Sequence, residues 1–171
     1  MEACEFKCYA PYNFGTLVMD KRAVCGASVS DEAERQKARR AFKDAVRYSS
    51  NELENHMLPR VLNRNVSFLL QTTPNRVPDV NIDVPAEDIA EAKALLTSLE
   101  RDVFPRFPTA NWASTLYHLN KCDYYTRCGS FHAGKRFVGH NYTEMMGYCP
   151  CFSFYSYCYL KYQFLSSLKA C

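Results

Sequence analysis

Apolar residues recur at helical spacing in three stretches of the chain. The first stretch follows the acidic run from Asp31 to Glu34, which suits the positive end of a helix. Its apolar residues repeat every three or four positions and predict a long amphipathic helix that ends before Pro59. The residues of this stripe are Ala38, Ala41, Phe42, Ala45, Val46, Leu53 and Met57.

The second stretch predicts a helix that follows Asp83, has Pro85 in its first turn and stops before Pro105. Its seam, with spacings of three and four residues, is made by Ile89, Ala92, Leu96, Leu99 and Val103.

The third stretch predicts a helix from about Ala110 to Arg127, and Gly129 is placed to cap its end. One face of this helix carries Trp112, Leu116 and Leu119.

The remaining stretches show no such period. Residues 1–29 contain Pro11, Gly15 and Gly26, and they predict an irregular arm that bears cysteines. Residues 59–85 predict an extended connector, within which 66–70 form a short buried strand or a helical turn. After Cys151 the aromatic residues are too dense for a period to be decided, so that segment stays open.

These elements predict a mainly α fold with at least three amphipathic helices in a single domain. The domain comprises an N-terminal arm (1–29), a helical core (30–128) and a C-terminal lobe (129–171) that is rich in cysteine and aromatic residues and is stabilised by disulfides. With 171 residues, 47% of them hydrophobic and 23% charged, the chain can bury a core of ordinary size.

Charge and hydropathy narrow the class of partner. The net charge of +3 does not favour nucleic acid or an anionic membrane. No run of eighteen apolar residues occurs, so no transmembrane span is expected, although peripheral membrane contact stays open. The partners expected are therefore other protein subunits.

Nine cysteines gather at the two ends of the chain, and residues 26–121 contain none. This placement predicts disulfides, and the odd number leaves one thiol free or bonded to a second chain. The disulfide candidates are Cys4, Cys8, Cys25, Cys122, Cys128, Cys149, Cys151, Cys158 and Cys171.

Disulfides require an oxidising compartment. The N-terminal sequence lacks the basic and apolar regions of a secretory signal, so the mitochondrial intermembrane space is favoured and an extracellular location is the alternative. Two glycosylation sequons, at Asn65 and Asn141, favour secretion only weakly.

A metal site is a weaker interpretation of three of these positions. Cys122, Cys128 and His132 follow a C-x5-C-x3-H spacing that resembles the second half of a CCCH zinc finger. Zinc needs four ligands, and no cysteine stands at 113–114, where that family places its first ligand. Disulfides are therefore favoured over zinc, and no cofactor is expected.

Catalysis and nucleic-acid binding are two further interpretations of the sequence. His118, His132 and His140 lie near Lys135 and Arg136, a set that could serve phosphoryl transfer in a small secreted hydrolase acting through His132 and His140. Exposed or capping histidines are the favoured interpretation, so no catalytic residue is assigned.

The basic residues of the first predicted helix could track the phosphates of a nucleic acid. A solvated face with intrahelical ion pairs is favoured instead. These residues are Arg35, Lys37, Arg39, Arg40, Lys43 and Arg47.

The aromatic C-terminal residues suit either a core or a partner surface. The interface candidates are Tyr155, Tyr157, Tyr159, Tyr162 and Phe164. The leading hypothesis is a non-enzymatic accessory subunit of a larger protein assembly, such as a mitochondrial complex of the respiratory type. The alternative is a secreted cysteine-rich ligand or toxin-like domain, linked as a dimer through the ninth cysteine.

Overall fold

The computed structural model of the chain describes residues 2–25, 32–50, 57–73, 81–107, 111–134, 136–137 and 163. In α1 the side chains are described over residues 7–19. The elements in chain order are α1 (Glu2–Cys25), α2 (Glu32–Ser50), α3 (Leu58–Leu69), α4 (Ala86–Ser98), a π-helical turn (Leu99–Val103), a 3-10 turn (Phe104–Arg106) and α5 (Asn111–Arg127). No strand occurs in this described part, and the mainly helical fold class is confirmed.

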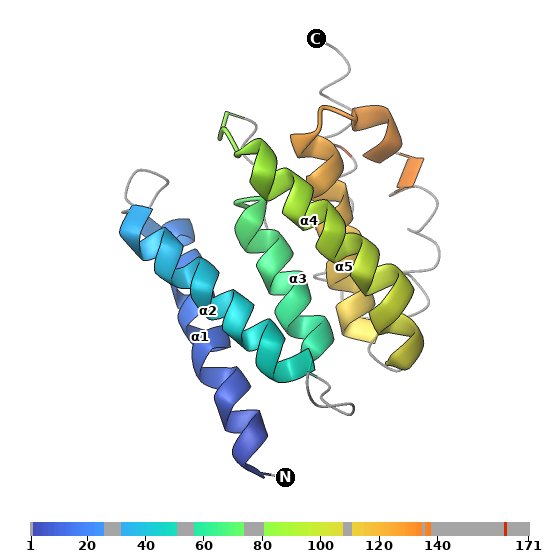
Figure 1. The fold of residues 1–171 in the computed structure, drawn as a ribbon. Coiled ribbons are helices and arrows are strands. Elements are labelled where there is room, and N and C mark those ends of the chain that lie inside the picture. Colours follow the sequence, from blue (N-terminus) through green and yellow to red (C-terminus); the bar gives the residue numbers. More distant parts are fainter. Residues whose placement is uncertain are drawn as a thin grey trace.

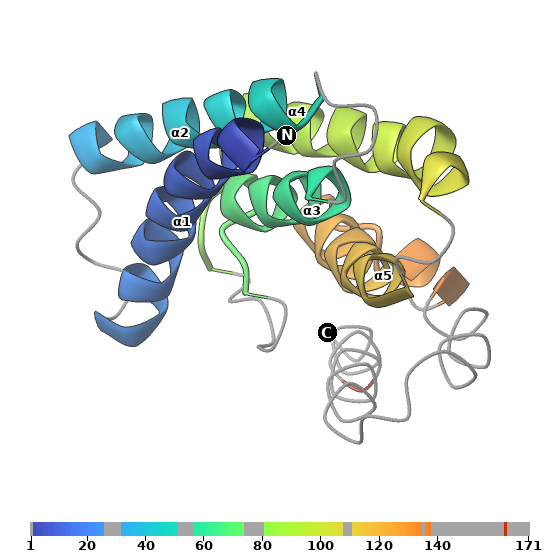
Figure 2. The ribbon, with the colours of Figure 1, turned by 90° about the horizontal axis from the view of Figure 1, so that it is seen from below.

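The helices run alternately up and down and form two layers (Figure 1). Viewed from below, α2 and α4 make one layer, and α1, α3 and α5 make the other (Figure 2). α3 lies in the middle and contacts each of the other four helices. α1 and α2 pack closely together on one side of the bundle, and α5 lies on the other.

The prediction of an irregular N-terminal arm was wrong, because Glu2–Cys25 form α1. Pro11 lies inside this helix and removes the N–H that would bond to the carbonyl of Lys7. Lys7 is exposed, so water can satisfy that carbonyl. Gly15 weakens a helix when considered alone, but here it gives the ring of Phe42 in α2 room to pack against the backbone of α1.

The first predicted helix exists as α2, and the core positions of its stripe are buried. Its described end is Ser50, whereas Met57 stands at the start of α3 and not at the end of α2. Pro59 does not end α2, because a proline is equally tolerated in the first turn of a helix, and Pro59 occupies that place in α3. Leu53 lies outside the described residues.

The prediction of an extended connector over 59–85 was also wrong, because α3 is the central helix of the fold. Residues 66–70 are buried as expected, but they belong to the last turn of α3 and its cap. The apolar residues of α3 occupy one half of its circumference and, apart from Asn65, its polar residues occupy the other half, so the helical period is present in the sequence, but the prediction treats Pro59 as a stop and misses it. Three of these polar residues are themselves buried: Asn63, Asn65 and Ser67.

A buried polar network joins α3 to α5. The side-chain amide of Asn63 donates to the carbonyl oxygens of Pro59 (2.9 Å) and Ala113 (3.1 Å). Asn120 in α5 donates to the carbonyl oxygen of Asn63 (2.8 Å) and accepts a hydrogen bond from the Ser67 hydroxyl (2.7 Å). Because each amide meets several partners, their burial between the helices is compensated.

Arg127, in the last turn of α5, donates hydrogen bonds to backbone carbonyl groups at the end of α3. Its guanidinium donates to the carbonyl oxygens of Leu70 (3.0 Å), Gln71 (3.3 Å) and Ile82 (3.2 Å). Gln71 has a left-handed backbone (φ 52°), a conformation that normally favours glycine. At the end of α5 the corresponding left-handed position is held by Gly129 (φ 65°), as the sequence predicted.

The second and third predicted helices are confirmed as α4 and α5. Pro85 occupies the N-cap position of α4, just before the first turn, and four of the five seam residues are buried: Ala92, Leu96, Leu99 and Val103. The C-terminal lobe lies almost entirely outside the described residues. No described helix is long and apolar enough to cross a membrane.

We expect Gly15→Ala to destabilise the fold by about 1–3 kcal/mol, as overpacked core positions do. A Cβ at this position would lie 2.6 Å from the ring of Phe42, whose side chain is fully buried and has little room to move. Helix propensity alone predicts the opposite sign, a gain of about 1 kcal/mol. Urea unfolding of the variant decides the sign, with Asn13→Ala on the exposed side of α1 as the control that should not destabilise.

We expect Asn120→Ala and Ser67→Ala to be coupled. Ser67→Ala leaves Oδ1 of Asn120 without its donor, and Asn120→Ala leaves Oδ1 of Asn63 without its donor, although the Ser67 hydroxyl keeps its bond to the Asn63 carbonyl oxygen. A buried acceptor left without a donor costs about 1–3 kcal/mol. The double variant should therefore lose about 0.5–3 kcal/mol less than the sum of the two single losses. A double-mutant cycle by urea unfolding measures this difference, and strictly additive losses would contradict the network.

Candidate functional site

The C-terminal end of α4 continues into a π-helical turn, Leu99–Val103, which is followed by a 3-10 turn, Phe104–Arg106. Pro105 explains why regular α-helix stops here, because it has no N–H to offer the carbonyl four residues earlier. Leu99 and Val103 stay buried through this turn. Glu100, between them, directs its carboxylate to α5. Such π-helical turns are frequent at functional sites, which makes this region a candidate site.

Glu100 meets a tyrosine and a lysine of α5. The hydroxyl of Tyr117 donates to its Oε2 atom (2.9 Å), and Nζ of Lys121 lies 3.1 Å from the same oxygen. Lys121 also donates to the Tyr117 hydroxyl (2.6 Å). Burial alone would raise the pKa of Glu100, but the hydrogen bonds from Tyr117 and Lys121 outweigh it and lower that pKa. Burial and the carboxylate of Glu100 both raise the pKa of Tyr117. The arrangement is therefore an ammonium, a carboxylate and a neutral phenol that satisfy one another.

Aromatic rings surround this lysine. Nζ of Lys121 lies 5.1 Å from the centre of the Tyr117 ring and 4.9 Å from that of Phe137, within the range of cation–π attraction. The edge of Phe104 packs on Tyr117, with ring centres 5.3 Å apart. His118 completes the group, 5.4 Å from the Phe137 ring. We call Glu100, Tyr117, His118, Lys121 and Phe137 the Glu100 cluster.

His118 is held neutral in this cluster. Burial and the nearby charge of Lys121 lower its pKa to about 4, and Glu100 opposes the shift only in part. Its Nδ1 atom is buried with no hydrogen-bond partner among the described residues, and Nε2 lies 3.5 Å from the hydroxyl of Ser114. The neutral imidazole therefore packs against the aromatic side chains as one more ring of the cluster. The Glu100 cluster thus joins the π-helical turn, α5 and the 136–137 segment, and its charged groups are occupied by one another.

A second group of charges joins α2 to α4. Asp88, whose side chain is 1% exposed, pairs with both Arg35 and Arg39. Arg39 also pairs with Glu91. Two arginines around one buried carboxylate compensate its loss of hydration, and only the removal of both would leave the carboxylate buried without a partner. This group therefore stabilises the contact between the two helices.

The three residues of the zinc hypothesis are not brought together. Cys122 is buried in α5, whereas Cys128 and His132 are exposed beyond the helix end. Six residues of α-helix turn a side chain through about 600°, so Cys122 and Cys128 point in different directions. Among the described residues, no three acidic, histidine or cysteine side chains gather where they could hold a metal ion.

The histidines weighed for catalysis are also separated. His118 lies within the Glu100 cluster, and His132 is exposed in the segment after α5. His140 and Lys135 lie outside the described residues.

Three cysteines are described with their side chains, and none of these three forms a disulfide in this structure. Cys8 is buried, directs its thiol at the carbonyl oxygen of Ala45 (3.6 Å) and has a pKa raised by burial. Cys128 is exposed, and burial and this thiol raise the pKa of Tyr124 to about 12. The side chains of the other six cysteines lie outside the description, so the disulfides remain a prediction. These six are Cys4, Cys25, Cys149, Cys151, Cys158 and Cys171.

Two exposed surfaces, one on α1 and one on α2, take no part in the groups described above. On α1, Phe14 (41% exposed) and Leu17 (66% exposed) stand one turn apart, on the side opposite the buried residues of that helix. On α2, the basic residues that do not reach α4 are exposed. The predicted interface residues lie outside the described part of the chain: Tyr155, Tyr157, Tyr159, Tyr162 and Phe164.

Sequence reasoning missed both the Glu100 cluster and the exposed side of α1. Tyr117 and Lys121 stand four residues apart, the spacing at which helical side chains meet, and that signal could have paired them. The partnership with Glu100 depends on the π-helical turn, which apolar periodicity does not reveal. Phe14 and Leu17 were hidden because the segment was interpreted as irregular.

We expect the stability of the fold to decrease as the pH falls from about 6.5 towards 4, in part because of His118. In this window the unfolded chain takes up a proton, at the ordinary histidine pKa of 6.5, that folded His118 does not bind until about pH 4. The free energy of unfolding should therefore lose up to about 1.4 kcal/mol per pH unit from this group.

Urea unfolding at several pH values measures that slope. His118→Phe should flatten the slope, because it keeps an aromatic ring and removes the proton site. His132→Gln, at an exposed histidine, should keep the wild-type slope. Equal slopes for wild type and His118→Phe would contradict the buried neutral imidazole.

Comparisons with protein-family models, with curated proteins and with solved structures found no match to this chain.

Proposed function

We propose that this chain is a non-enzymatic accessory subunit that packs against other proteins in a larger assembly. The observation that carries this proposal is the exposed apolar side of α1. Phe14 and Leu17 are the large apolar side chains that stand exposed in the described part of the chain, and both belong to this one helix.

α1 is apolar on two opposite sides. One side packs into the core through Cys8, Tyr12 and Met19. The other presents Phe14 and Leu17 to solvent, only one helical turn apart. A helix that is apolar on both sides is typically covered on both sides. A single exposed apolar residue would need no explanation, but two neighbours on a peripheral helix favour a contact with another protein.

The polar groups support a structural role. The Glu100 cluster and the pairing of Asp88 with its arginines both occupy their charged atoms in contacts between helices. Neither presents a nucleophile or a free acid–base pair in the described part of the chain. We therefore propose that the polar groups of this chain hold helices together.

The proposed compartment is an oxidising one, with the mitochondrial intermembrane space favoured and disulfides among the terminal cysteines. The support is the number and placement of the cysteines. Asn65 contributes nothing to the secreted alternative, because it is buried within α3 (4% exposed) and a glycan there could not be accommodated by the folded core. Asn141 lies outside the described residues.

A photoreactive amino acid at Leu17, introduced in cells that produce the protein, tests the proposal. We expect a discrete crosslink to another protein from position 17 and none from Thr97, an exposed residue of α4. Phe14→Ser combined with Leu17→Ser should shift the chain from a large native complex to the monomer in size-exclusion chromatography. A wild-type chain that is already a monomer in the cell extract, with no crosslink at position 17, would overturn the proposal.

The secreted cysteine-rich ligand is the second candidate, and the exposed thiol of Cys128 favours it. An exposed thiol just after the last described long helix is accessible to a second chain. Intact-mass measurement of the native protein with and without reductant distinguishes the candidates, since a dimer linked through Cys128 would halve in mass on reduction.

A further inference from the structure

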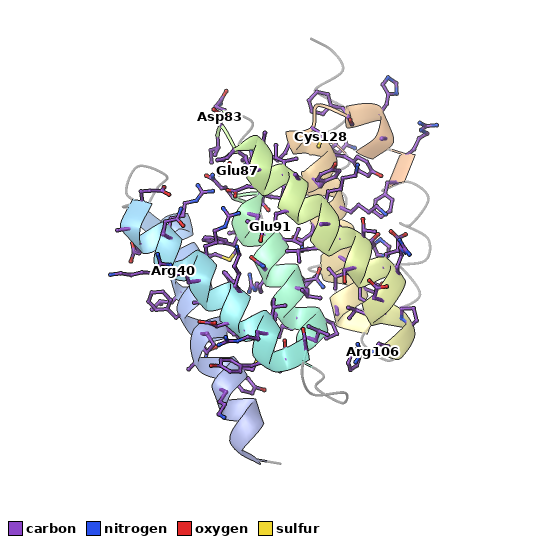
Figure 3. All side chains as sticks on the ribbon, in the orientation of Figure 1. Arg40, Asp83, Glu87, Glu91, Arg106 and Cys128 are labelled. Atoms are coloured by element: carbon purple, nitrogen blue, oxygen red, sulfur yellow. The ribbon has the colours of Figure 1, made fainter. Side chains whose placement is uncertain are left out.

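The outer side of α2 carries a row of exposed cations that we call the α2 ridge. It consists of Lys37, Arg40, Lys43 and Arg47. At about 100° per residue these positions fall within one third of the helix circumference. The buried positions of α2 fall on the opposite side: Ala38, Phe42, Ala45 and Ser49. Figure 3 shows Arg40 pointing away from the bundle, whereas Glu91 faces the space between α2 and α4.

The ridge is the part of the basic helix that the fold does not use. Arg35 and Arg39 are engaged by the acids of α4. Within the ridge, Arg47 pairs with Asp44 (3.1 Å). No described acid pairs with the other three cations, so three positive charges face solvent along about 9 Å of helix.

These three charges weaken the isolated helix. Cations three or four residues apart repel each other, and each such pair costs a few tenths of a kcal/mol in a solvated helix. None of the three side chains packs in the core, so folding does not explain their presence. An anionic group bound on the ridge would turn this repulsion into attraction.

The exposed apolar residues of α1 lie at the same level of the bundle. α1 and α2 run in opposite directions, with Gly15 against Phe42 and Cys8 against Ala45. Phe14 and Leu17 therefore stand beside the stretch of α2 that carries Arg40 and Lys43. Figures 1 and 2 show that the two helices together form one side of the molecule, away from α5. An apolar anchor and a basic row are thus presented by the same pair of helices.

We infer that the α1–α2 pair binds an acidic segment of a partner protein, whose carboxylates face the α2 ridge while its apolar side chains cover Phe14 and Leu17. This inference rests on the proposed function and names the chemistry of the partner. Carboxylates combined with apolar groups match both features. The two apolar side chains bury too little area to hold a bilayer. The small net charge of the chain supplies no long-range field for a polyphosphate.

Binding of fluorescently labelled poly-L-glutamate at low salt tests the carboxylate preference of the ridge. The ridge variant is K37Q/R40Q/K43Q. The matched control, K93Q/R101Q/R106Q, removes three exposed cations from α4 and the turns after it. Both variants change the formal net charge from +3 to zero, so they remove the same total charge from different positions.

We expect the ridge variant to weaken binding roughly tenfold or more, and the control variant to weaken it far less. Wild-type affinity should fall as salt is raised, because exposed charges are screened. Thermal unfolding of both variants checks that they fold, and the ridge variant should be no less stable than wild type, since its repulsion is relieved.

Three results would overturn the inference: no binding of poly-L-glutamate to wild type, equal weakening in both variants, or tighter ridge-dependent binding of poly(U) RNA or of phosphatidylserine–phosphatidylcholine vesicles. The crosslink at Leu17 separates this failure from that of the proposed function. If the crosslink persists while the ridge shows no carboxylate preference, a protein partner exists but is not recognised through acids.

Discussion

The burial of α3 at the centre of the bundle is the constraint on which the rest of the structure depends. Ten of its twelve residues are buried, and only the side that carries Arg60 and Arg64 is open, so the helix needs neighbours around most of its circumference. α1 and α2 cover it from one side, and α4 and α5 cover it from the other. A short helix with this much buried surface has little stability alone, because helices of this length are marginal in water. Its formation and the assembly of the bundle are therefore one event.

Polar atoms inside this core fix how the helices meet. Apolar packing tolerates small rotations of a helix about its axis, whereas hydrogen bonds between Asn63, Ser67 and Asn120 are directional. Arg127 adds a second constraint, because it donates to two carbonyl groups at the end of α3 and to that of Ile82, ahead of α4. The rotation and the relative height of α3 and α5 are thus set by groups that an all-apolar core would lack.

The positively charged residues fall into two groups, those that pair within the fold and those that face solvent. Arg35 and Arg39 serve a buried carboxylate of α4, and Lys121 serves Glu100 in the π-helical turn. The cations of the α2 ridge, on the same helix as the two arginines, do neither. Residues of one chemical type therefore divide into those that hold the fold and those left for a partner, according to the side of the helix on which they lie.

The sequence by itself determined α2, α4 and α5, because their apolar spacing, acidic starts, prolines and a terminal glycine are signals within one helix length. It did not determine α1 or α3, where Pro11, Gly15 and Asn63 argue locally against a helix. Gly15 is compensated by Phe42, 27 positions away, and Asn63 by Asn120, 57 positions away.

The residues of the candidate sites were also only partly predictable from the sequence. The basic residues of α2 were evident in the sequence, but which of them face α4 and which face solvent depended on the bundle. The spacing of Cys122, Cys128 and His132 suggested a metal site, but the turn of the helix directs their side chains apart. The Glu100 cluster forms across the π-helical turn, which residue spacing in the sequence does not predict. Local pattern encodes the helices that carry their own signals. Contacts between distant residues decide the others, because only they can compensate a proline, a glycine or a buried amide.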